Sequence, residues 1–150
     1  MKPRYSGFSL VELMVTVSIA AILLSIAIPS YNNYVRKSRR TDAKSALLDM
    51  ASLEERFYSA NNFYTNAAAQ LGYPGSWPVH VGDPVNGYSI AQPAVNPATA
   101  PSAGSPGGTP ATFSIVATPT GDQLNDTCTS FTVDSSGQQI ATPNAATCWR

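Results

Sequence analysis

The sequence predicts an α+β fold in which a long, kinked N-terminal helix packs on a C-terminal antiparallel sheet. Three observations support this prediction. An apolar run over residues 8–28 leads into a segment with helical spacing of apolar residues that continues to about residue 60. Asparagine, proline and glycine then interrupt the pattern. Beyond them, short stretches of alternating apolar and polar residues are typical of half-buried strands.

The apolar run contains one charge, Glu12, followed by sixteen uncharged residues over Leu13–Ile28. That length suits most of a membrane-spanning helix. A carboxylate there is costly and implies a function and a partner. We expect the partner to be a new α-amine, created if a short basic leader is cut after Gly7. An ordinary secretory signal is the alternative, with cleavage near residues 25–27, but it would leave Glu12 without a purpose.

The motif Gly7-Phe8-Ser9-Leu10-Val11-Glu12 resembles the class III signal sequence of type IV pilins and pseudopilins. The likeness continues through Pro29 and the tyrosines Tyr31 and Tyr34. It returns at the C-terminus, where Cys148-Trp149-Arg150 is similar to the ends of minor pilins. The resemblance therefore implies a type IV pilin fold.

The same resemblance implies how the chain is processed and assembled. A membrane-bound prepilin peptidase would cut between Gly7 and Phe8 and methylate the new Phe8 amine. Glu12 would then pair with the Phe8 amine of a neighbouring subunit and fix the axial register of the fibre. No catalytic, metal or cofactor site is expected. The chain is predicted to be a substrate of another enzyme and not an enzyme itself.

The predicted organisation has four parts. Residues 1–7 are the leader, and residues 8–30 form the hydrophobic transmembrane and assembly helix. Residues 31–60 form the amphipathic second half of that helix, and residues 61–150 form a globular β-sheet domain with a disulfide-closed C-terminal region. Pro29 is expected to kink the helix, because it lacks an N–H and clashes with the preceding turn.

In the second half of the helix, one apolar stripe is expected to pack on the sheet, with the acidic and basic residues elsewhere. The stripe comprises Ala43, Ala46, Met50, Leu53 and Phe57, and the charged residues are Asp42, Lys44, Asp49, Glu54 and Glu55. The helix is predicted to end at Asn61-Asn62, and Asn66 to cap a short helical turn over residues 67–71. Strands are predicted over residues 87–91, 112–118, 129–134 and 138–142, with a hairpin turn at 134–137.

The pair Cys128 and Cys148 predicts a disulfide if the domain is exported, whereas in the cytoplasm both would stay reduced. The segment Pro93–Pro110 has five prolines, three glycines and no charge, so we expect an exposed loop. A tolerated surface insertion is the preferred interpretation. Glycosylation is the alternative at its hydroxyl residues, Thr99, Ser102, Ser105 and Thr109.

Charged residues are 12% of the 150-residue chain, below the ~25% of ordinary domains, and the net charge is zero. Five cations follow the apolar run: Arg36, Lys37, Arg39, Arg40 and Lys44. They are expected either to contact anionic lipid headgroups before assembly or acidic neighbours in the fibre, or to form a solvated helix face. From residue 57 onward the sequence has four aspartates and a single Lys or Arg, Arg150. This balance argues against a strongly basic DNA-binding surface.

The remaining chemical candidates are weak. His80 lies in a Pro-rich segment predicted to be a loop and has no neighbouring ligand for a metal cluster. Asp122 and Asp126, with Asn125 between them, fit either a calcium loop or a solvated turn, and the turn is preferred. The motif Asn125-Asp126-Thr127 also fits an N-glycosylation acceptor, but because the motif is short it gives little support for glycosylation.

The predicted function is a structural subunit of a type IV pilus, most like a minor pilin, in adhesion, twitching motility or DNA uptake. Major pilin and type II secretion pseudopilin are the alternatives, and a DNA-receptor role is not favoured. The expected partners are other pilin subunits, the prepilin peptidase, the inner membrane and the pilus assembly machinery. The chain is expected to be a single-pass inner-membrane protein before assembly, and then part of an extracellular pilus.

Overall fold

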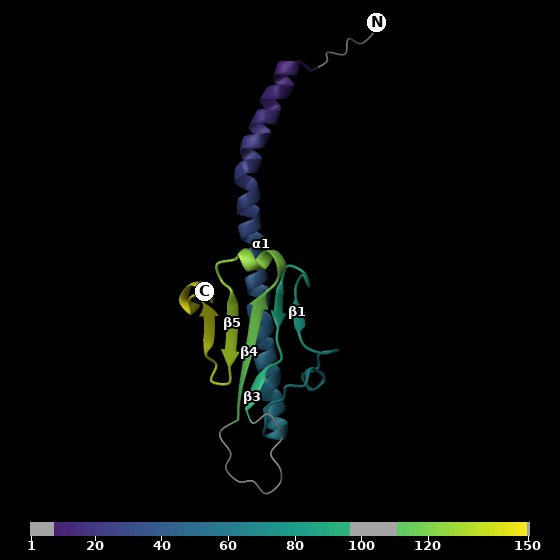
Figure 1. Ribbon diagram of the computed structural model, residues 1–150, viewed down its shortest axis with the longest axis vertical. Helices are drawn as coiled ribbons and strands as arrows, with labels where there is room; N and C mark the ends of the chain where they lie inside the picture. The colour runs from purple at the N-terminus through teal and green to yellow at the C-terminus, as the bar shows by residue number, and fades with distance from the viewer. Residues whose placement is uncertain (1–7, 97–110, 150) are drawn as a thin grey trace. The chain divides into compact units, whose positions relative to one another are not determined.

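The computed structural model describes residues 8–96 and 111–149 (Figure 1). One long helix is followed by a small antiparallel sheet, which confirms the predicted α+β class. The chain forms two compact units, one ending at Lys37 and the other beginning at Ser38. The elements are α1 (Leu10–Asn61), the 3₁₀ turn η1 (Ala68–Leu71), β1 (Val79–Val81), β2 (Tyr88–Ile90), β3 (Ala94–Asn96), β4 (Thr112–Pro119), the 3₁₀ turn η2 (Gly121–Asn125), β5 (Ser130–Asp134), β6 (Gln139–Thr142) and α2 (Ala145–Cys148).

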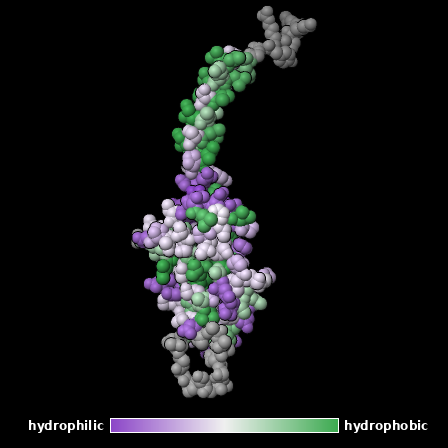
Figure 2. All heavy atoms as spheres, viewed as in Figure 1, coloured by the Kyte–Doolittle hydropathy of each residue, from purple (hydrophilic) through white to green (hydrophobic). Residues whose placement is uncertain are grey.

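In the first unit, α1 is exposed on every side. All residues from Phe8 to Tyr34 are exposed. Figure 2 shows that hydrophobic colour predominates on the narrow upper part of the molecule, which is this part of the helix. The helix is continuous through Pro29, so the proline does not divide it into two helices. A bend angle at Pro29 stays a prediction.

In the second unit, one face of α1 packs on the sheet. Ala43, Leu47, Met50 and Glu54 are its buried residues, separated by steps of four, three and four. The predicted stripe is confirmed at Ala43 and Met50, while Leu47 belongs to the row and was not predicted. The placement of Glu54 outside the packed face was wrong. The other predicted members are half-buried beside this row: Ala46, Leu53 and Phe57.

The sheet has six antiparallel strands in the order β1-β2-β4-β5-β6, with β3 also paired to β4. Strands β2 and β3 lie along the same edge of β4. Four residue steps from Ile90 to Ala94 oppose three from Ala117 to Ser114, so the edge carries a one-residue bulge. Pro93 falls in this bulge, where the ladder needs no N–H.

The sequence prediction gave four of the six strands. Strands β1 and β3 were missed, and each is only three residues long. The expected loop over Pro93–Pro110 was therefore wrong at its start, because Ala94–Asn96 is a strand. The rest of that segment, including its candidate glycosylation residues, lies outside the described residues.

Alternating side chains of the central strands form the core beneath α1. Phe113, Ile115, Phe131 and Val133 are all at most 3% exposed, as their alternation predicted. Burying a side chain of this size contributes about 1.5–3 kcal/mol relative to leaving it exposed. Ring contacts add specificity, such as the edge-to-face pair of Phe131 and Trp149 with centroids 5.6 Å apart.

The predicted end of the long helix and the predicted hairpin turn are confirmed, and the predicted cap at Asn66 is wrong. The helix ends as expected, with Asn62 in the left-handed region at φ 62°. In the hairpin turn, the Asp134 carboxylate accepts the N–H groups of Ser136 and Gln138. Asn66 does not cap η1, because Ala67 holds the capping position and makes no side-chain hydrogen bond.

Candidate functional site

The largest functional feature is the apolar surface of α1 in the first unit. Between residues 8 and 28, the large apolar side chains are 51–81% exposed. The helix is long and apolar enough to cross a membrane. Soluble monomers rarely expose a contiguous apolar surface of this extent. Another hydrophobic phase, lipid or protein, must therefore cover it in the functional state.

Glu12 is the single charged residue between Phe8 and Val35. It lies exposed in the first turn of α1. In the first unit, three hydroxyls of α1 donate to carbonyls of the preceding turn: Thr16 to Leu13, Ser18 to Met14 and Ser25 to Ile22. Such bonds satisfy these polar groups inside the helix, as an apolar environment requires. A carboxylate cannot donate such a bond, so an outside partner for Glu12 stays a prediction, and Gly7 lies outside the described residues.

A second feature is a buried ion pair that joins α1 to the loop after η2. The Arg40 guanidinium contacts both carboxylate oxygens of Asp126, and its Nε donates to Oδ2 at 2.6 Å. It also donates to the Thr127 hydroxyl at 3.0 Å. Burial opposes ionisation of Asp126, but the hydrogen bonds and charge of Arg40 outweigh it and hold its pKa below the ordinary value. The same bonds raise the pKa of Arg40.

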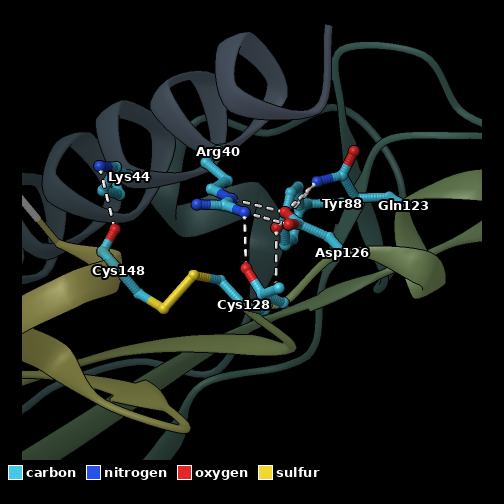
Figure 3. A network of polar contacts seen from close by, with 8 residues as sticks. Arg40, Lys44, Tyr88, Gln123, Asp126, Cys128 and Cys148 are labelled. Atoms are coloured by element: carbon cyan, nitrogen blue, oxygen red, sulfur yellow. Dashed lines mark hydrogen bonds and ion pairs between the residues drawn. A yellow bond between two sulfur atoms is a disulfide. The ribbon is translucent and has the colours of Figure 1, made fainter. Parts of the chain in front are cut away.

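Neighbouring groups extend this pair into the network of Figure 3. The Gln123 amide donates to Oδ2 of Asp126 at 2.7 Å and contacts the Tyr88 hydroxyl at 3.3 Å. Tyr88 in turn donates to the Cys128 carbonyl at 3.3 Å. Burial raises the pKa of Tyr88 to about 12, so its hydroxyl keeps its proton at neutral pH. The network holds α1, β2 and the region beyond η2 in one arrangement.

The predicted disulfide between Cys128 and Cys148 is confirmed, with its Cα atoms 5.8 Å apart. Both cysteines are 2% exposed. Lys44, one helical turn beyond Arg40, donates to the carbonyls of Cys148 and Trp149 at 3.2 and 3.4 Å. Arg40 and Lys44 therefore bind near the two ends of the disulfide-closed segment (Figure 3).

These contacts correct the interpretation of the cations after the apolar run. Arg40 and Lys44 bind the protein's own domain, and Arg39 pairs with Asp83 at 3.7 Å. The solvated helix face is therefore wrong for these three residues, while contact with lipid or with acidic neighbours in the fibre stays a prediction. They fasten α1 to the sheet because their long side chains reach neighbouring loops.

The structure also shows where the acidic segment 122–126 and His80 lie. The preferred solvated turn is wrong for Asp126, which is 8% exposed and paired with Arg40, whereas Asp122 is exposed. His80 lies on β1, not in a loop, and is exposed. Within residues 8–96 and 111–149, no group of three or more His, Cys, Asp or Glu could hold a metal ion.

Glu54 is a second buried acidic residue, besides Asp126, whose burial the sequence analysis did not predict. It is fully buried, and one of its carboxyl oxygens accepts the Thr65 N–H at 3.1 Å. The other oxygen has no hydrogen-bond partner among the described residues. Burial raises the pKa of this carboxyl to about 7. The available signal was its spacing, because Glu54 follows Met50 by four residues on the packed face.

Comparison with known protein families places this architecture. A family model described as "Type IV minor pilin ComP, DNA uptake sequence receptor" matches residues 29–132, more than half of the chain. The chain belongs to this family. A second model, the prokaryotic N-terminal methylation motif, matches residues 2–28 of the pilin. The long helix and antiparallel sheet are thus a type IV pilin fold.

Curated relatives of the pilin are mostly major pilins by name. It is 35% identical over 71 residues to the type IV major pilin protein PilA of Myxococcus xanthus, an alignment that covers 47% of this chain and 32% of the relative. It is 36% identical over 87 residues to the type IV major fimbrial protein FimA of Dichelobacter nodosus, covering 51% and 53%. With the prepilin peptidase-dependent protein D of Escherichia coli the identity is 58% over 39 residues, covering 26% and 27%. The chain thus spans about half or less of each relative.

Proposed function

We propose that this pilin is a minor subunit of a type IV pilus, cut between Gly7 and Phe8 and built into the filament through residues 8–28. The observation that carries the proposal is a helix exposed on all sides and apolar, joined to a domain with its own closed core. The match to a minor-pilin family supports the minor role. The match to the N-terminal methylation motif supports processing at Phe8.

Glu12 sets the axial register of the subunit in this proposal. Apolar helices packed side by side in a fibre tolerate sliding, because one apolar surface resembles the next. A carboxylate buried there without a partner costs several kcal/mol, and the Phe8 amine of a neighbouring subunit would offset that cost. The Glu12 carboxylate and the neighbouring Phe8 amine can meet at only one axial offset between the two subunits.

Replacing the carboxylate tests this role. Glu12→Gln keeps the shape of the side chain and removes its charge, and Asp49→Asn removes an exposed charge from the same helix as a control. We expect both variants to be cut by the peptidase. Only Glu12→Gln should lose incorporation, measured as its amount in sheared filaments relative to the membrane pool. Equal incorporation of the two variants would reject the register role.

The second candidate is a DNA receptor within the pilus, which the description of the matched family favours. The second unit supplies few cations for phosphate contacts. Arg39, Arg40 and Lys44 bind the domain itself, while Arg56 and His80 are exposed. A receptor of this kind would depend on few phosphate contacts and would bind DNA with a shallow salt dependence.

This candidate is tested by measuring DNA affinity of the full chain in detergent at several salt concentrations. Each phosphate contact contributes about 0.9 to the slope of log K against log salt. Receptor function predicts saturable binding with a slope of about 1–2 in magnitude. Absence of binding at low salt would remove the receptor candidate and leave the structural one intact.

A further inference from the structure

An open hollow lies between the last turns of α1 and the 3₁₀ turn η1, which both belong to the second unit. We call it the α1–η1 hollow. Its volume is about 240 Å³, and seven residues line it: Leu53, Arg56, Phe57, Ala60, Asn61, Gln70 and Leu71. Sites for cofactors and drug-sized ligands measure about 300–1,000 Å³. The size of this hollow therefore suits one side chain together with the backbone beside it.

One part of the lining is apolar and firmly packed. Leu71 is 3% exposed, and Leu53 and Phe57 are half-buried against the core. The Phe57 ring makes an edge-to-face contact with Phe63, and the two centroids lie 5.3 Å apart. An occupant with an apolar side chain would be stabilised by covering this surface.

The two amide side chains of the lining each have one end committed to the protein. The Thr65 hydroxyl donates to Oε1 of Gln70, which leaves the N–H groups of the Gln70 amide for an occupant. The Asn61 amide nitrogen donates to the Phe57 carbonyl at 2.9 Å, which leaves Oδ1 of Asn61 as an acceptor. The hollow therefore offers N–H donors at Gln70 and an acceptor at Asn61.

Arg56 supplies the positive charge of the hollow and is exposed. The other Lys and Arg side chains in residues 38–96 and 111–149 bind the unit itself: Arg39, Arg40 and Lys44. Within those ranges the Arg56 guanidinium has no ion pair or hydrogen bond. A guanidinium matches a carboxylate through two parallel N–H···O bonds, so this cation is available to an acidic partner.

These groups together fit a short piece of polypeptide. A carboxylate can accept from Arg56 and Gln70, while a backbone N–H can donate to Asn61. A phosphate ester has no N–H for Asn61, and its charge would be met by a single cation. The apolar lining adds a third requirement, which is a large apolar side chain next to the carboxylate.

The charge balance of the second unit indicates where such carboxylates are plentiful. Eight of the nine Asp and Glu residues of the chain lie beyond residue 37, against five of the nine Lys and Arg residues. A neighbouring subunit with a similar surface would present carboxylates to an unpaired cation. A pilin segment is thus complementary in charge to the α1–η1 hollow.

We propose that the α1–η1 hollow binds a segment of a neighbouring pilin subunit in which an Asp or Glu lies beside a large apolar residue. The carboxylate pairs with Arg56, and the apolar side chain covers Phe57 and Leu71. This contact rests on the proposed function, because it forms only in the assembled filament. It is separate from the packing of residues 8–28 and from the role of Glu12.

Site-specific photo-crosslinking of the full chain in filaments tests the proposal. The reporter is p-benzoylphenylalanine in place of Ala69, which is exposed and adjoins Gln70 without lining the hollow. Filaments are irradiated on cells and sheared, and the linked peptides are identified by mass spectrometry. The yield is measured per reporter chain in the filaments.

Two variants alter the hollow, and each has a matched control on the same helix. Arg56→Gln removes the charge, with Lys37→Gln as its control. Ala60→Trp fills the hollow, with Ser59→Trp as its control. All four positions are exposed, and the two control positions do not line the hollow.

We expect the reporter to link to a segment of another pilin subunit that contains a carboxylate beside a large apolar residue. Arg56→Gln should lower the yield about fivefold, the effect of losing one ion pair, and Ala60→Trp should abolish it. Both controls should retain the yield. Incorporation lost only in the two hollow variants would support the same contact.

Two kinds of result would overturn the proposal. Chains that enter filaments but give no link to another subunit, or the same link in all variants, would overturn the contact and leave the proposed function standing. A link to lipid or to a protein outside the filament would do the same. Chains that are never found in filaments would reject the proposed function and this contact together.

Discussion

The buried carboxyl of Glu54 makes the stability of the second unit depend on pH. Its pKa in the folded chain is about 7, against an ordinary value of 4.5. Between these two values the unfolded chain has lost the proton and the folded chain keeps it. The free energy of unfolding therefore falls as pH rises through this window, and it is constant above it. Each pKa unit corresponds to about 1.4 kcal/mol, so the total loss is about 3 kcal/mol.

Glu54→Gln is expected to remove this loss. The amide is neutral at every pH and its oxygen can still accept the Thr65 N–H. Near pH 4 the variant should match the original chain within about 1 kcal/mol, and at pH 8 it should be more stable by about 3 kcal/mol. The nearby titratable groups, Glu55 and Tyr64, are unchanged, and Asp49→Asn serves as a control that removes an exposed carboxylate from the same helix.

The assay is urea unfolding of the full chain in detergent, followed by circular dichroism from pH 4 to pH 8.5. The unfolding free energy of the original chain and of Asp49→Asn should fall over the window from 4.5 to about 7, while that of Glu54→Gln should not. Parallel curves for all three proteins would refute the reasoning. They would mean that water or a local opening solvates the Glu54 carboxylate in the folded state.

Three further predictions concern the contacts that hold α1 and the C-terminal segment. Arg40→Met should destabilise the second unit by about 3 kcal/mol, because it leaves the Asp126 carboxylate buried without its cation. Adding Asp126→Asn should recover part of that loss, measured by urea unfolding of both single variants and the double variant. Replacing Cys128 and Cys148 together by serine should cost about 2–5 kcal/mol relative to the oxidised native chain, measured by thermal unfolding. The reduced native chain should match the double variant, and equal stability of the variant and the oxidised chain would contradict the prediction. Asn62→Ala should cost about 1 kcal/mol while Asn62→Gly should not, because the residue has a positive φ.

Local signals along the chain predicted the main elements. The helical stripe and the Asn61-Asn62 signal placed the helix end within one residue of Asn61. Alternation predicted the longer strands and the inward positions of Phe113 and Phe131. The three-residue strands β1 and β3 gave no such signal. Strand β1 is held by its pairing with β2, and β3 by its pairing with β4. These pairings form only on folding, so a three-residue segment read alone does not indicate them.

The polar contacts within the fold could not be predicted for a different reason. Arg40 and Asp126 are 86 residues apart, and charge type alone does not tell which pairs will meet. An exposed cation and one that fastens a loop look the same in a sequence, as do a solvated and a buried aspartate. The disulfide was predictable because two cysteines in an exported domain allow one intramolecular pairing. The burial of Glu54 had a weak signal in its spacing, but its polarity favoured the opposite interpretation.

The most direct test of the assembly role is quantitative mass spectrometry of filaments sheared from cells. The account predicts a peptide that begins at N-methylated Phe8, present at a small fraction of the dominant subunit. The same peptide as the most abundant species would make the chain a major pilin. A chain that is processed but absent from filaments, or found still carrying residues 1–7, would contradict assembly through the α1 helix.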